Sequence, residues 1–159
     1  MLAYGKGLWN QAASHFRKAI EIDPNYKEAY YNLGLALKKT GDLKGAMENY
    51  RRAIKIDPNY KEAYCNLGVA LFNTGDLKGA VENYRRAIKI DPNFKEAYFN
   101  LGVALFNTGD LKGAVENYRR AIEIDPNYSK AYYNMFILME AKGSAGELLE
   151  AVKFVEGQV

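Results

Sequence analysis

The tetrapeptide Asp-Pro-Asn-aromatic constrains the fold of this 159-residue chain more than any other feature. It recurs at a constant step of 34 residues, at positions 23–26, 57–60, 91–94 and 125–128. Because proline lacks a backbone N–H and clashes with the preceding turn, a helix that reaches it must end there. A repeat period of this size indicates a solenoid of stacked helical units. The chain is therefore predicted to be all-α.

Two recurring signals predict where the helices of each unit begin. After the proline, Asn25 is expected to accept hydrogen bonds from the first free N–H groups, with Glu28 completing a capping box. In the middle of the unit, glycine suits a left-handed turn and the following aspartate suits the cap of the second helix. These Gly-Asp pairs are Gly41-Asp42, Gly75-Asp76 and Gly109-Asp110, and the other Asn and Glu pairs are Asn59 with Glu62 and Asn93 with Glu96.

The period divides the chain into five segments of one solenoid domain. Residues 27–60, 61–94 and 95–128 are complete repeats of two helices. Residues 1–26 are a partial repeat, mainly a second helix near residues 8–22, in which Met1 to Lys6 remain of a preceding helix. Residues 129–159 are a degraded terminal or capping repeat, with Phe136 in place of a recurring glycine. The pattern predicts nine helices beyond the short N-terminal stub.

Composition and charge favour no nucleic-acid or membrane partner. The chain has 22 basic and 19 acidic residues, a net charge of +3 that is too balanced to indicate nucleic-acid binding. No segment is apolar enough for a membrane span or a signal peptide. The second helices carry basic residues opposite their apolar face, which we interpret as a solvated outer surface. The single cysteine allows no internal disulfide, which suits a cytoplasmic protein.

No set of residues in the sequence indicates catalysis, a metal or a cofactor. His15, the only histidine, has no carboxylate or cysteine at a ligand-like spacing. Cys65 has no second thiol or histidine nearby, and the equivalent residue of the next repeat is Phe99, so a thiol nucleophile is not expected. There is no phosphate-binding loop. We expect no enzyme activity from this chain alone and no cofactor.

The repeat pattern resembles the tetratricopeptide repeat. Tyr, Leu, Gly, Leu, Ala, Tyr, Ala and Pro recur at the spacing of that family over nearly the whole chain. In the three complete repeats they are Tyr30, Leu33, Gly34, Leu37, Ala46, Tyr50, Ala53 and Pro58; Tyr64, Leu67, Gly68, Leu71, Ala80, Tyr84, Ala87 and Pro92; and Tyr98, Leu101, Gly102, Leu105, Ala114, Tyr118, Ala121 and Pro126. The small residues at Gly34 and Ala46 are expected to let paired helices approach closely.

The resemblance implies a right-handed superhelical solenoid of antiparallel helix pairs, whose first helices line a concave groove. It implies a protein or peptide partner in that groove. The groove residues would be Tyr31, Asn32, Leu35, Lys38 and Lys39; Cys65, Asn66, Val69, Phe72 and Asn73; Phe99, Asn100, Val103, Phe106 and Asn107; and Tyr133, Asn134 and Ile137.

The groove contains one asparagine per repeat: Asn32, Asn66, Asn100 and Asn134. The row resembles that of the repeat region of O-linked N-acetylglucosamine transferases. Such an amide has donors and an acceptor, so it could pair with a peptide backbone or bridge neighbouring helices, and the sequence leaves both possibilities open. Chaperone-tail adaptors of the family instead clamp a C-terminal carboxylate with Lys and Arg, whereas the matching positions here are Glu62, Asn66, Glu96 and Asn100.

The favoured hypothesis is a non-catalytic scaffold that binds an extended or helical peptide in the groove. One alternative is a scaffold that assembles with copies of itself through exposed solenoid ends. The N-terminal end is the better candidate for such contacts, because Leu8, Trp9, Ala12 and Phe16 would be left partly bare there. Another alternative is the substrate-targeting arm of a larger enzyme, such as a glycosyltransferase. The identity of the partner, the source of the chain and its oligomeric state do not follow from the sequence.

Overall fold

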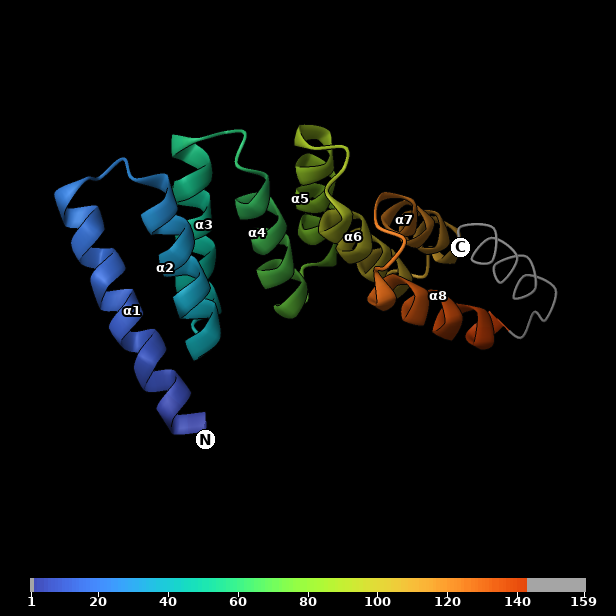
Figure 1. Ribbon diagram of the computed structural model, residues 1–159, viewed down its shortest axis with the longest axis horizontal. Coiled ribbons are helices and arrows are strands. Elements are labelled where there is room, and N and C mark those ends of the chain that lie inside the picture. Colours follow the sequence, from blue (N-terminus) through green and yellow to red (C-terminus); the bar gives the residue numbers. More distant parts are fainter. Residues whose placement is uncertain (1, 143–159) are drawn as a thin grey trace. The chain divides into compact units, whose positions relative to one another are not determined.

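The computed structural model describes residues 2–142, and it is helical throughout apart from short connections (Figure 1). The all-α prediction is confirmed over this range. The eight helices are α1 (Leu2–Ile22), α2 (Lys27–Thr40), α3 (Leu43–Ile56), α4 (Lys61–Asn73), α5 (Leu77–Ile90), α6 (Lys95–Asn107), α7 (Leu111–Ile124) and α8 (Ser129–Lys142). The predicted ninth helix lies outside the described residues.

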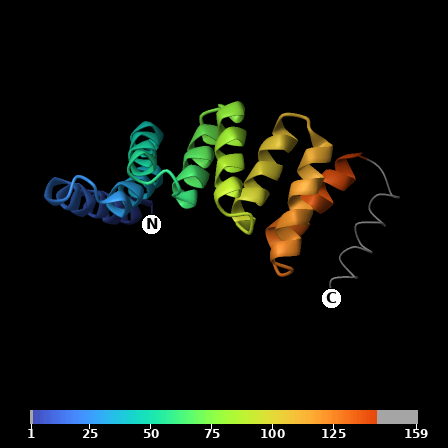
Figure 2. The same cartoon turned by 90° about the horizontal axis from the view of Figure 1, so that it is seen from above.

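The chain divides into two compact units at the third proline stop. Unit 1 is Met1–Asp91 and contains α1 to α5, and unit 2 is Pro92–Val159 and contains α6 to α8. In unit 1 each helix packs on the next along the chain, and in unit 2 α7 packs on both α6 and α8. Figures 1 and 2 show α2 beside α3 and α4 beside α5 in both views.

The predicted Gly-Asp turn joins the two helices of each complete repeat. Gly41 ends α2 in the left-handed region at φ 94°, where only glycine avoids a steric penalty. The Asp42 carboxylate then accepts a hydrogen bond from the Gly45 N–H at 2.8 Å and caps α3. The same arrangement recurs at Gly75-Asp76 and Gly109-Asp110. Both parts of the turn prediction are confirmed.

The predicted asparagine caps of the first helices are wrong. The N-cap residue of α2 is Tyr26, and no side chain caps it. The side chain of Asp23 instead accepts from the Asn25 N–H at 2.9 Å, so a local Asx turn occupies the loop. The N-caps of α4 and α6 are Tyr60 and Phe94, also without a side-chain cap.

The predicted N-terminal stub is also wrong, because Leu2 to Lys6 are part of α1 rather than the remnant of an earlier helix. Gly7 and Leu8 occupy the positions of the Gly-Asp turn in later repeats. Leu8 has no carboxylate to cap a new helix, and Gly7 is not among the glycines with positive φ. The backbone therefore continues as one helix through this point.

The core of each complete repeat is built where the paired helices cross. A Cβ atom at Gly34 would lie 2.6 Å from Cε1 of Tyr50, so only glycine admits the ring. Ala46 and Ala53 flank Tyr50 and are fully buried. The same contacts recur at Gly68 with Tyr84 and at Gly102 with Tyr118. The predicted close approach of the two helices is confirmed. The side of each first helix that does not face its second helix remains available for other contacts.

Candidate functional site

The predicted groove residues lie on the first helices, α2 and α4 in unit 1 and α6 and α8 in unit 2. Each first helix buries one stripe against its second helix; in α2 the stripe is Ala29, Leu33, Ala36 and Leu37. Most of the predicted residues are half-buried. The exposed ones are Lys39, Asn73, Phe106, Asn107, Tyr133 and Ile137. Cys65 differs, since it is only 5% exposed and belongs to the core.

In unit 1 the amide of Asn66 bridges α2 and α4. Its Nδ2 donates to the Tyr31 hydroxyl at 3.0 Å and to the backbone oxygen of Glu62 at 3.1 Å. Its Oδ1 accepts from the Lys38 Nζ at 2.7 Å. Of the two roles that the sequence left open, the structure thus gives Asn66 the helix-bridging one, with its acceptor and donors in use.

Lys38 is the cationic member of this hydrogen-bond network. Desolvation on burial lowers the pKa of its ammonium below the usual lysine value, and the neighbouring Lys39 acts in the same direction. An ammonium has three donors, of which Asn66 takes one. Lys38 forms no ion pair with the described residues. A ligand oxygen could therefore accept from Lys38 without breaking an existing ion pair.

The aromatic residues Tyr31 and Phe99 pack against their own unit as well as facing outward. The ring centroid of Tyr31 is 6.0 Å from that of Tyr50 and 5.1 Å from that of Tyr60. The ring of Phe99 lies 5.9 Å from that of Tyr118 and 5.5 Å from that of Tyr128, in a tilted and an edge-on arrangement. These contacts hold both side chains in place.

In unit 2 three predicted groove residues, Val103, Phe106 and Asn134, come together around an open hollow of about 100 Å³. Tyr118 and Ile137 complete its lining. Phe106 is 38% and Ile137 42% exposed, so the hollow has an apolar rim that faces solvent. Asn134 Nδ2 is 3.5 Å from the Tyr118 hydroxyl and adds one polar group. The arrangement suits an apolar side chain next to a hydrogen-bonding group.

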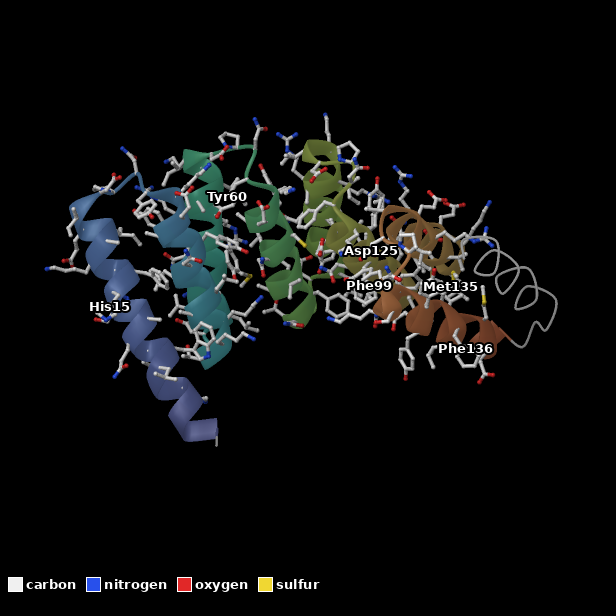
Figure 3. All side chains as sticks on the ribbon, in the orientation of Figure 1. His15, Tyr60, Phe99, Asp125, Met135 and Phe136 are labelled. Carbon is white, nitrogen blue, oxygen red and sulfur yellow. The ribbon has the colours of Figure 1, made fainter. Side chains whose placement is uncertain are left out.

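Figure 3 shows two neighbouring residues of α8, Met135 and Phe136, that behave differently. Met135 is buried, whereas Phe136 is exposed. Phe136 occupies the position that is Gly34, Gly68 and Gly102 in the complete repeats. A phenylalanine cannot enter a crossing that excludes even a methyl group, so its exposure agrees with the predicted departure from the repeat packing.

Sequence reasoning missed the part that the second helices play in the groove. Tyr118 lies on α7, yet its side chain reaches the hollow formed by α6 and α8. The motif identified it only as a core residue. The sequence signal that could have identified Tyr118 is the pairing of a large aromatic residue on the second helix with a glycine on the first. The ring of Tyr118 lies against Gly102, where no side chain blocks it.

The described residues contain no group of three or more His, Cys, Asp or Glu able to hold a metal ion. His15, labelled in Figure 3, is exposed on α1, and Cys65 is buried. From Leu2 to Lys142, no helix has both the length and the apolar composition needed to cross a bilayer.

The N-terminal helix has an uncovered apolar face. Leu8 is 54% and Trp9 38% exposed, while Ala12 and Phe16 are half-buried. The residues equivalent to Ala12 and Phe16 in the first complete repeat, Ala46 and Tyr50, are fully buried because α2 covers them.

Family models cover most of the chain. Models described as TPR repeat match residues 3–41, 37–75 and 70–109, and models described as Tetratricopeptide repeat match residues 96–128 and 117–153. No curated protein sequence matches the chain.

Solved structures similar to this chain include the crystal structure of MamA, with a TM-score of 0.82 and 30% identity over 95% of this chain and 86% of that one. The crystal structure of YrrB, described as a TPR protein with an unusual peptide-binding site, has a TM-score of 0.73 and 26% identity over 91% of this chain and 74% of that one. The first TPR of Spaghetti (RPAP3), bound to an HSP90 peptide, has a TM-score of 0.72 and 23% identity over 74% of this chain and 94% of that one, which shows similarity of fold alone.

Proposed function

This chain belongs to the tetratricopeptide repeat family, and we propose on that premise that it is a non-catalytic protein-interaction scaffold whose first helices bind an extended or helical peptide. The observation that carries the proposal is the solvent-facing hollow of unit 2. Phe106 and Ile137 keep large apolar surface in water beside it, which a ligand side chain would cover.

The polar network of unit 1 supports the same proposal with different chemistry. The ammonium of Lys38 has donors left after its bond to Asn66, and a peptide carbonyl or a carboxylate would accept from them. Because Asn66, itself bound to Tyr31, already holds the ammonium of Lys38, less side-chain entropy remains to be lost on binding. The two units would thus contact a peptide in different ways, unit 1 through charge and unit 2 through apolar burial.

The similarity to YrrB supports a peptide ligand, since that protein is described as having a peptide-binding site and is 26% identical over 91% of this chain. An isolated solenoid of this family gives no reason to expect turnover. Cys65 is buried in the core, and the sequence has no second thiol, so neither it nor the exposed His15 indicates an active site.

The experiment selects peptides from a phage-displayed library of random dodecapeptides on the wild-type protein and measures their affinities by titration calorimetry. Replacing both Phe106 and Ile137 by Ala is expected to weaken the selected peptides at least about tenfold, as for residues central to an interface. The matched control is Ile22→Ala, which truncates an exposed apolar residue on α1 and is expected to leave the affinities unchanged. Circular dichroism monitors helicity in each variant. Failure to select any peptide, or unchanged affinity in the double variant, would contradict the proposal.

A second candidate function, self-association through the N-terminal end, is favoured by the exposure of Leu8 and Trp9. Covering these side chains with a second copy would remove apolar surface from water. Light scattering at increasing protein concentration tests this hypothesis, and a monomeric mass at all concentrations would rule it out.

A further inference from the structure

The outer side of unit 1 has a strongly basic surface formed by its two second helices, α3 and α5. Eight exposed basic residues make it up, and we refer to them as the basic face: Lys44, Arg51, Arg52, Lys55, Lys78, Arg85, Arg86 and Lys89. The only acidic residues on these two helices are Glu48 and Glu82. The eight basic residues lie on the side of α3 and α5 opposite the buried Ala46, Tyr50 and Ala53 and their equivalents. The basic face therefore points away from the core.

None of the eight side chains of the basic face forms an ion pair with the described residues. The ion pairs of unit 1 involve other lysines, namely Lys18, Lys27 and Lys61. Arg51 and Lys55 are four residues apart on one helix, where like charges destabilise rather than stabilise it. An anionic partner would relieve this repulsion.

Two of the arginines are held in place by aromatic rings. The guanidinium carbon of Arg52 lies 5.9 Å from the ring centroid of Tyr30, and that of Arg86 lies 5.8 Å from the ring of Tyr64. A cation over a ring face is attracted by its quadrupole. The planar guanidinium is thereby oriented before any ligand arrives, and its fork geometry matches a carboxylate.

Unit 2 provides a natural contrast. The sequence of α7 equals that of α5 except at one position, where Glu123 stands in place of Lys89. The Glu123 carboxylate accepts from Arg120 at 3.0 Å, although Arg120 is stacked on Tyr98 just as Arg52 and Arg86 are stacked on their tyrosines. Arg120 therefore has an ion-pair partner, Glu123, at the position where α5 has Lys89. This single difference distinguishes the outer side of α7 from the basic face of unit 1.

We propose that the basic face of unit 1 binds an acidic polypeptide segment, on helices other than those that carry the groove. None of the exposed large apolar residues lies on α3 or α5, so the surface has no side chains to insert into a bilayer. The rings of Tyr30 and Tyr64 are covered by arginines and are not free to stack with bases. Carboxylates spaced along a polypeptide fit the remaining chemistry, which is a row of exposed and unpaired cations.

The test measures binding of a fluorescein-labelled peptide of sixteen glutamates, acetylated and amidated at its ends, by fluorescence anisotropy. The double substitution Lys55→Glu and Lys89→Glu gives α3 and α5 the residue of α7 and is expected to weaken binding at least tenfold. The charge-matched control, Lys18→Glu with Lys130→Glu, changes two exposed lysines outside the basic face and is expected to weaken binding less than twofold. The single substitution Glu123→Lys gives α7 the residue of α5 and is expected to tighten binding.

Three results would overturn the proposal. One is an equal loss of affinity in the control, which would mean that net charge alone attracts the peptide. Another is tighter binding of a sixteen-nucleotide single-stranded DNA, or of phosphatidylserine vesicles, that Lys55→Glu with Lys89→Glu abolishes. The third is no binding of the glutamate peptide at all. The variant with Ala at Phe106 and Ile137 is expected to bind the glutamate peptide normally, so failure of the groove and failure of the basic face are distinguishable.

Discussion

The first and third complete repeats, residues 27–60 in unit 1 and 95–128 in unit 2, have nearly the same core and different groove surfaces. In both, a glycine of the first helix lies against a tyrosine of the second, with Gly34 against Tyr50 and Gly102 against Tyr118. Four of the five predicted groove positions differ, and two of these differences bear on the polar contacts. Tyr31 and Lys38 of the first repeat correspond to Phe99 and Phe106 of the third.

These two differences change the partners of residues that the repeats share. In unit 2 the amide of Asn134 lies 3.5 Å from the hydroxyl of the core tyrosine, Tyr118. In unit 1 the equivalent amide, Asn66, binds Tyr31 and Lys38 instead. The hydroxyl of Tyr50 is consequently buried without a hydrogen-bond partner in the described structure. A groove substitution can thus alter the polar contacts of the core while the packing of the helices stays the same.

The largest expected loss of stability comes from disrupting the glycine–tyrosine contact that the two repeats share. Replacing Gly34 or Gly102 by Ala puts a Cβ atom about 2.6 Å from a ring that has no room to move, so each substitution is expected to destabilise the chain by about 1–3 kcal/mol. Urea denaturation followed by circular dichroism measures the change. The control is Gly7→Ala on α1, where a Cβ would meet nothing within 4 Å, and it is expected to stabilise by about 0.5–1 kcal/mol. Equal changes in stability at Gly7 and Gly34 would show that helix propensity, and not steric crowding, determines the effect of the substitution.

A smaller change in stability is expected to distinguish the two core tyrosines, Tyr50 and Tyr118. Tyr50→Phe removes a buried hydroxyl that has no partner and is expected to raise the free energy of unfolding by about 1 kcal/mol. Tyr118→Phe removes a hydroxyl that has Asn134 beside it and is expected to give no such gain. In a Tyr31→Phe background Asn66 loses its tyrosine partner and can turn to Tyr50, so the gain from Tyr50→Phe should shrink. Identical changes for Tyr50→Phe and Tyr118→Phe would contradict the contrast between the units.

The smallest expected effect concerns an ion pair found in both repeats. Lys27 contacts Asp57 and Lys95 contacts Asp125, each at 2.5 Å, and this bond holds the pKa of both aspartates below the ordinary value, with help from the backbone N–H two residues on. A carboxylate whose pKa is lower in the folded state contributes stability above its unfolded pKa and loses it as the pH falls through the folded value.

The melting temperature is therefore expected to fall below about pH 4. The fall should be smaller in the variant with Asn at positions 57 and 125, which has no carboxylate to titrate there. Thermal melts between pH 7 and pH 2.5 measure both curves. The effect is expected to be modest because the pairs are close to solvent. Parallel curves for the variant and the wild type would exclude a contribution from these pairs.

The local elements of this fold were predictable from sequence, because short-range rules decide them. The proline stops and the left-handed turn at Gly41 depend on residues a few positions apart, and both are found in the structure. The cap predicted at Asn25 failed for a local reason too, since Tyr26 is the N-cap residue and Asn25 lies one position before it, in the turn that Asp23 closes. The N-terminal stub failed because Leu8 cannot start a new helix where the later repeats have aspartate.

The sequence predicted which helix carries each proposed groove residue, but not which residues it contacts. The repeat spacing placed Cys65 and Asn66 on the first helix of the second repeat, and that placement is correct. It did not indicate that Cys65 is buried or that Asn66 is bound on both sides of its amide. Residues equivalent by period can face different neighbours, because their neighbours come from the preceding repeat, whose groove residues differ.

The sequence by itself determined the all-α fold, the period of the helices and the close approach of paired helices at their small residues, since these follow from backbone geometry and residue size repeated at one spacing. Only the tertiary structure decided which polar groups have hydrogen-bond partners and which do not. Asn66 meets Tyr31 across 35 positions of sequence, and Lys38 meets Asn66 across 28. Hydrogen bonds require atoms within about 3 Å, and distances between helices at that scale exist only once the helices have packed.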